Sequence, residues 1–184
     1  ERERTFRLLE EGSGALRDAD RFDDSYVQLV AWDQATRSVV GAYRLGRTDE
    51  LLRERGASGL YLAQMFRFSR GFHQQGGAAL ELGRSFVVPE HQKSFHGLYL
   101  LWQGIGRYLV AHPHYRRLYG TVSLTRQFAA EAVAMLCDVL VNATNDVEPR
   151  HPLETPLPPE WQQCRSAFDP GNLESLARLF RATG

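Results

Sequence analysis

The sequence predicts an α/β fold (α+β) in which a β-hairpin precedes alternating strands and helices. Two runs rich in β-branched and aromatic residues, 26–32 and 38–45, flank a turn-like link at 33–37, the pattern of an antiparallel hairpin. Residues 78–88 form the strongest strand pattern. Helical patterns cover 96–111 and 126–141, with a further strand at 118–124 between them. A chain of 184 residues, 43% hydrophobic and 24% charged, suits one globular domain.

The remaining elements are weaker. A helix is expected at 2–11, broken by the glycines at positions 12 and 14, and a short helix at 48–57. Residues 59–67 fit a strand or a helix, and 71–77 read as a loop. In the strand at 78–88, alternation places Leu80, Leu82 and Phe86 on one face, and Pro89 ends the strand. The helix at 96–111 has an apolar stripe formed by Leu98, Leu101, Trp102, Ile105 and Leu109.

The composition changes after residue 144, where six of the eight prolines occur. We expect a compact domain at 1–144, followed at 145–184 by a proline-rich arm and a final helix at 172–181 packed on that domain.

Charge and composition exclude several classes of function. Lys and Arg total 22, as do Asp and Glu, so no net charge favours nucleic acid. No apolar run reaches the length of a membrane span. Cys137 and Cys164 lack metal-binding spacing and fit a reducing cytoplasm. The histidines form no metal pattern, and no serine-hydrolase elbow or nucleotide-binding glycine motif occurs. The chain opens at Glu1 without a methionine and has no signal peptide, as expected of a fragment of a longer protein.

Glu81 and Arg84 are the first candidates for chemistry, because they interrupt an otherwise apolar strand. Charges in such a place require partners. A regular strand would place them on opposite faces, but a bulge at Gly83 would bring them together. Either Glu81 orients or deprotonates an amine while Arg84 fixes a partner, or the two form a structural ion pair.

The loop at 90–97 leads into the helix at 96–111. Free amides at a helix N-terminus attract anions; Lys93 adds charge and Ser94 is a candidate N-cap. The loop fits a phosphate of coenzyme A or of phosphopantetheine, or else an ordinary helix start. The acidic cluster at 18–24 fits either a cationic ligand or turn capping.

Three segments, 20–32, 39–45 and 81–90, together resemble the GNAT-like N-acyltransferases of bacterial ornithine and glycine lipid synthesis, often labelled hemolysin-like. They are most similar to the GNAT portion of bacterial proteins assigned as lysophospholipid acyltransferases, and more distantly similar to acyl-homoserine-lactone synthases. The resemblance covers residues 2–125. It implies a mixed, mostly antiparallel sheet, splayed between the strands at 78–88 and 118–124, with flanking helices and with a pantetheine arm in the opening.

The resemblance also implies roles for individual residues. Glu81 is the acidic catalytic residue and Arg84 its partner, and Asp23 and Arg44 lie at the acceptor. Amides of Phe86, Val87 and Val88 bind the donor and polarise the thioester. A loop containing Gln92, Lys93, Ser94 and Gly97 binds the phosphate of the donor. Phe95 breaks the family's glycine pattern there, which favours acyl carrier protein over coenzyme A as donor.

The sequence therefore predicts an acyltransferase that moves a long-chain acyl group from acyl carrier protein, or coenzyme A, to a small amine such as an amino acid. No metal and no permanently bound cofactor are expected. The protein would act in the cytoplasm, with peripheral contact at the inner membrane. Two alternatives stay open: an acyl-homoserine-lactone synthase that uses S-adenosylmethionine, and a non-catalytic GNAT-like module of a larger acyltransferase.

Overall fold

The computed structural model describes residues 1–8, 12–74, 77–123, 128–142, 146–151 and 154–159, together with residues 161, 165, 172 and 174. The chain divides into two compact units, described separately. The first comprises 1–63 and 75–121, and the second 64–74 and 122–184. No helix in the described ranges is long and apolar enough to cross a membrane.

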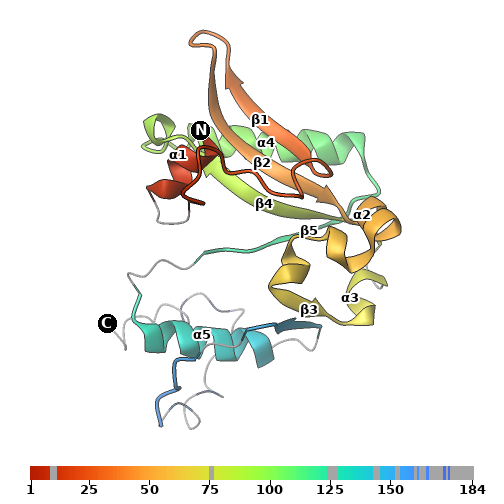
Figure 1. Cartoon of the computed structure of the whole chain (residues 1–184), viewed down its shortest axis with the longest axis vertical. Helices are drawn as coiled ribbons and strands as arrows, with labels where there is room; N and C mark the ends of the chain where they lie inside the picture. The colour runs from red at the N-terminus through yellow and green to blue at the C-terminus, as the bar shows by residue number, and fades with distance from the viewer. Residues whose placement is uncertain are drawn as a thin grey trace. The chain divides into compact units, whose positions relative to one another are not determined.

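A four-stranded sheet in the order β1-β2-β4-β5 forms the centre of the first unit (Figure 1). Strands β1 (Val27–Asp33) and β2 (Ser38–Arg47) form the expected antiparallel hairpin, and β2 pairs antiparallel with β4 (Ala79–Val87). Strand β5 (Arg117–Gly120) runs parallel to β4 but pairs only with residues 79–82. The expected splay is therefore present, although residues 121–123, predicted as strand, lie outside β5.

A bulge in β4 divides the strand into two differently oriented halves. Between the pairs Arg44–Gly83 and Ala42–Phe86, β4 contains one more residue than β2. The bulge expected near Gly83 is thus confirmed, and Arg84 within it has a left-handed φ of 48°. The extra residue reverses the alternation of side chains. The prediction that Phe86 shares a face with Leu80 and Leu82 is therefore wrong.

The two faces of the sheet are covered differently. Helix α4 (His96–Ala111) lies behind the sheet in Figure 1, with Leu101 packed beneath Gly41 of β2. On the other face, Phe6 of α1 (Arg2–Arg7) packs edge-on against Phe86, with ring centroids 6.3 Å apart. Phe22, Tyr26, Leu51 and Leu60 form a second cluster that includes helix α2 (Thr48–Arg55), confirmed as predicted.

The ambiguous residues 59–67 form 3₁₀ turns, η1 (Gly56–Gly59) and η2 (Leu62–Gln64), followed by strand β3 (Phe66–Phe68). In the second unit, β3 pairs antiparallel with β6 (Val147–Pro149). Helix α3 (Arg70–Gln74) occupies part of the predicted loop at 71–77. Helix α5 (Ala130–Asn142) packs its apolar face on Trp161. The predicted helix at 172–181 falls outside the described residues, apart from positions 172 and 174.

We expect Gly41→Ala to destabilise the fold by about 1–3 kcal/mol, the usual range for overpacking. A Cβ at position 41 would lie 2.5 Å from the backbone oxygen of Phe86, and that oxygen belongs to the β4 backbone, which has little freedom to shift. Denaturant unfolding of both proteins measures the difference.

Gly83→Ala is the matched control, because a Cβ there meets no heavy atom within 4 Å. Its stability should change by less than about 1 kcal/mol. Equal losses in the two variants would contradict the close approach of β2 and β4 at Gly41.

Candidate active site

Glu81 is a buried carboxyl group at the point where β4 and β5 separate. It pairs in register with Gly46 of β2 and Tyr119 of β5, one residue before the parallel ladder ends. Its side chain is 1% exposed. The backbone amide of Leu62 donates to Glu81 Oε1 over 2.9 Å, and Oε2 has no hydrogen-bond partner.

Burial raises the pKa of Glu81 to about 7, although the hydrogen bond from the Leu62 amide and the charge of Arg44 act in the opposite direction. A carboxyl group with this pKa exchanges protons readily near neutral pH. Its unpartnered Oε2 is the atom that can accept one. Glu81 therefore has the environment of a general base.

Arg44 is a buried cation on β2, opposite Gly83. Only 1% exposed, it donates from Nη1 to Asp20 Oδ1 over 2.7 Å and to Asp23 Oδ1 over 3.0 Å. Its guanidinium also lies 4.9–5.7 Å from the ring centres of Phe22, Tyr26 and Tyr61. Carboxylates and ring faces together compensate a charge that burial alone would expel.

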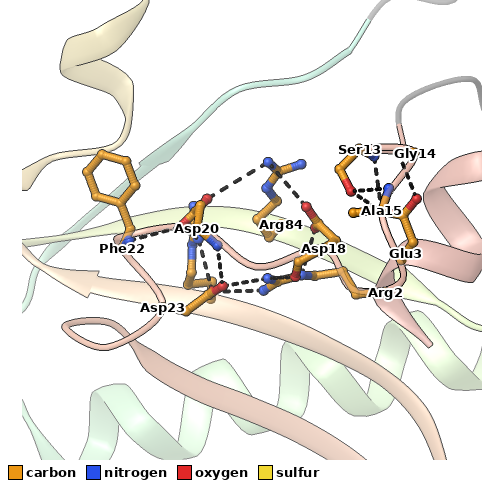
Figure 2. Close-up of polar contacts among 11 residues, drawn as sticks. Arg2, Glu3, Ser13, Gly14, Ala15, Asp18, Asp20, Phe22, Asp23 and Arg84 are labelled. Atoms are coloured by element: carbon orange, nitrogen blue, oxygen red, sulfur yellow. Dashed lines mark hydrogen bonds and ion pairs between the residues drawn. The ribbon is translucent and has the colours of Figure 1, made fainter.

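The segment before β1 supplies the acidic partners (Figure 2). Arg2 pairs with Asp18 over 2.7 Å and with Asp23 over 2.6 Å. Although burial opposes it, hydrogen bonds from Arg2, the Asp20 amide and Arg44 hold the pKa of Asp23 well below its usual range. Asp23 and Arg44, both predicted at the acceptor, thus contact each other directly.

Glu3 fixes the turn after α1. Its carboxylate accepts hydrogen bonds from the Ser13 hydroxyl, from the amides of Ser13 and Gly14, and from Arg7. Led by the Ser13 hydroxyl, these bonds lower the pKa of Glu3 to about 2. Sequence reasoning missed Arg2 and Glu3. Their only signal was the charge density of residues 1–4.

Arg84 does not pair with Glu81 as expected. Its Nη2 lies 3.6 Å from Asp18 Oδ1 and 3.8 Å from Asp20 Oδ2, beyond hydrogen-bond reach, and its Nε has no hydrogen-bond partner (Figure 2). The guanidinium lies over the rings of Phe6 and Tyr61, at 5.6 and 5.5 Å. The prediction fails because the bulge directs Arg84 toward the acidic segment, while Glu81 bonds to the backbone at Leu62.

The edge of β4 beyond the ladder offers one of the three predicted donor amides. The Val88 amide already donates to Val40 over 2.9 Å, so its predicted role as a free donor is wrong. Antiparallel alternation also directs the Phe86 amide toward β2 and the Val87 amide toward the edge that β5 leaves uncovered. Gln92 Nε2 donates to the Val87 carbonyl on this edge over 2.8 Å.

A cavity of about 220 Å³ adjoins this edge. Residues of helix α1, strands β2 and β4, helix α4 and the loop before it line this open cavity. The lining is mostly apolar: Thr5, Phe6, Tyr43, Ser85, Phe86, Val87, Gln92, Leu98 and Leu101. Phe86, Val87 and Gln92, which the sequence assigned to the donor, thus meet at one cavity.

The remaining loop residues lie at the start of α4. Its N-cap is Phe95 and has no side-chain cap, so the prediction of a Ser94 cap is wrong. Lys93 and Ser94 are exposed. Gly97 is buried, and a Cβ there would lie 2.7 Å from Val87 Cγ1. The absence of a side chain at Gly97 therefore lets α4 approach β4 closely. This packing role of Gly97 is separate from the phosphate contact predicted for it.

The chain is similar in sequence to known acyltransferases. A family model described as acetyltransferase (GNAT) domain matches residues 2–103. A protein named glycine N(alpha)-acyltransferase from Bacteroides thetaiotaomicron is 33% identical over 169 residues, covering 86% of this chain and 49% of that protein. Another of the same name from Phocaeicola vulgatus is 32% identical over 168 residues, covering 83% and 52%. The chain spans about half the length of these relatives.

A solved acetyltransferase from Trypanosoma brucei is 14% identical, with a TM-score of 0.37, over 73% of this chain and 72% of that one.

We expect Glu81→Gln to stabilise the protein more at pH 8 than at pH 5. Between the ordinary value of 4.5 and the folded pKa of about 7, the folded state keeps a proton that the unfolded chain loses, so stability falls as pH rises through this range. The full difference corresponds to about 3 kcal/mol. The neutral amide removes this dependence, so the stability gap between variant and wild type should widen by about 2 kcal/mol from pH 5 to pH 8.

Denaturant unfolding at both pH values measures this gap. Glu54→Gln, an exposed change on α2, is the control and should leave the gap constant. A constant gap for Glu81→Gln as well would contradict the raised pKa.

Proposed function

Because the chain belongs to the acetyltransferase (GNAT) domain family, we propose that it transfers an acyl group from a thioester to the amine of a small acceptor, an amino acid such as glycine. The observation that carries the proposal is the position of Glu81. A buried carboxyl group with an unpartnered oxygen lies where β4 and β5 part. The apolar cavity and the Val87 amide lie farther along the same strand.

The proposed reaction proceeds without an acyl-enzyme intermediate. Glu81 Oε2 removes a proton from the amine, and the nitrogen lone pair attacks the thioester carbonyl carbon. The Val87 amide donates to the carbonyl oxygen as negative charge develops on it. The carbon–sulfur bond then breaks, the sulfur leaves as a thiolate, and it takes up a proton to give the free thiol.

The donor we propose is a long-chain acyl group on acyl carrier protein, with coenzyme A as the alternative carrier. The apolar cavity accommodates part of an extended chain or arm at the uncovered edge of β4. The relatives named glycine N(alpha)-acyltransferase support glycine as acceptor. A long-chain N-acyl amino acid is amphiphilic, so we place the reaction in bacterial aminolipid synthesis, in the cytoplasm beside the inner membrane.

Thiol release from palmitoyl-carrier protein and palmitoyl-coenzyme A tests the proposal, with glycine, ornithine, lysine and S-adenosylmethionine as acceptors. We expect release that depends on an amino acid and yields an amide, identified by mass spectrometry. Folded protein that releases no thiol with any pair would refute acyl transfer. Lactone formation from S-adenosylmethionine would instead indicate a signal synthase.

For Glu81→Gln we expect kcat to fall by about 10²–10⁴-fold, the usual contribution of a general base. The wild-type kcat at saturating donor should rise as the pH increases through about 7, because Glu81 then loses its proton. The variant should lack this rise. Comparing the two pH profiles on one acceptor isolates Glu81 from ionisation of the amine itself. An unchanged profile in the variant would assign the proton transfer to another group.

A further inference from the structure

We propose that Arg84 binds the carboxylate of the acceptor, which makes the site selective for amino acids over simple amines. This inference rests on the acyl transfer proposed above. Three arginines and three aspartates form a charge cluster on this face of the sheet: Arg2, Arg44, Arg84, Asp18, Asp20 and Asp23. The inference starts from a difference among the three arginines.

Two of these arginines already have close anionic partners. Arg2 and Arg44 each hold carboxylates at 2.6–3.0 Å. The carboxylates nearest to Arg84 are Asp18 and Asp20, and each is bound more closely by another arginine, at 2.7 Å. In the described part of the chain, Arg84 makes two long ion pairs and no side-chain hydrogen bond. Arg84 is also 23% exposed, against 1% for Arg44, so a ligand can reach it.

The buried atoms without hydrogen-bond partners define the ligand's chemistry. They include the acceptors Glu81 Oε2 and Asp20 Oδ2 and the donors Arg84 Nε and Arg44 Nη2. Of these side chains, Glu81 and Arg44 are each 99% buried, where an unsatisfied polar atom costs about 1–3 kcal/mol. A simple amine supplies donors only. An amino acid supplies a nitrogen for Glu81 and a carboxylate for Arg84, so it provides both a donor and an acceptor.

Tyr61 and Leu62 connect the surroundings of Arg84 with those of Glu81. Arg44 and Arg84 lie 4.9 and 5.5 Å from the centre of the Tyr61 ring. The next residue, Leu62, donates its amide to Glu81. The guanidinium of Arg84 and the carboxyl group of Glu81 therefore border one segment on the same face of the sheet. In this binding mode, the nitrogen of a small amino acid lies at Glu81 and its carboxylate at Arg84.

The backbone at Arg84 supports a functional role. Its φ of 48° lies in the left-handed region, where a residue with a side chain is strained by about 1–3 kcal/mol. Glycine would adopt this conformation at lower cost. Since the bulge alone does not require an arginine, the guanidinium at this position needs a separate explanation, and carboxylate binding supplies one.

The test compares glycine with glycinamide, which keeps the amine but lacks the carboxylate. We expect Arg84→Gln to raise KM for glycine at least about tenfold, the loss of one charge-assisted contact, with kcat changed much less. KM for glycinamide should hardly change. Arg84→Lys should recover part of the loss. Because each comparison uses one acceptor, the different basicities of the two amines cancel.

Arg37→Gln is the matched control. Arg37 also has a left-handed backbone, with a φ of 51°, but lies exposed in the hairpin turn away from Glu81. Its kinetics should equal those of the wild type. Parallel losses on glycine and glycinamide in Arg84→Gln would overturn the inference and leave acyl transfer standing.

Binding of carbon-13 carboxyl-labelled glycine, followed by NMR, separates the two proposals. Binding that Arg84→Gln abolishes supports the carboxylate site even if no acyl transfer occurs, in which case the proposed function alone fails. Equal binding by wild type and variant overturns the inference.

Discussion

The buried guanidinium of Arg44 is the constraint on which the rest of this face depends. A cation inside a sheet is stable only with close anions and aromatic faces, and here Asp20, Asp23 and three rings supply them. Both aspartates lie before β1, so satisfying Arg44 holds the segment before β1 against the sheet. Asp23 in turn binds Arg2 at the start of α1. One buried charge thus orders the elements that surround the candidate site.

The same arrangement explains why Glu81 keeps a raised pKa beside so many arginines. Arg2 and Arg44 are each compensated by close aspartates, and the hydrogen-bonded oxygen of Glu81 accepts from a neutral backbone amide. Had Arg84 paired with Glu81, a close cation would have favoured the ionised carboxylate and lowered its pKa. The acidic segment therefore maintains the basicity of Glu81, although none of its aspartates contacts that residue directly.

Local patterns in the sequence were sufficient for the hairpin, for α2 and α4, and for the bulge, because periodicity and glycine placement encode them over a few residues. The partners of Glu81 and Arg84 were not predictable in this way. Arg84 meets Asp18 across 66 positions, and strand alternation cannot show which of several carboxylates comes closest. Although the bulge was expected, Phe86 was still predicted on the wrong face of the sheet. One inserted residue reverses the side on which every later side chain of β4 lies. The pairing of β3 with β6 was also not predictable, because both strands are short and neither has a clear strand pattern in the sequence.

The early end of the β4–β5 ladder has a consequence for self-association. Backbone groups beyond Leu82 have no β5 partner, so this edge can pair with any extended chain, including a strand of another molecule. The bulge at Arg84 interrupts the regular spacing that a long foreign strand would need, and places a charge at the interruption. Gln92 also occupies the Val87 carbonyl. The edge therefore admits a short, flexible arm more readily than a neighbouring strand, which protects the protein from edge-to-edge aggregation.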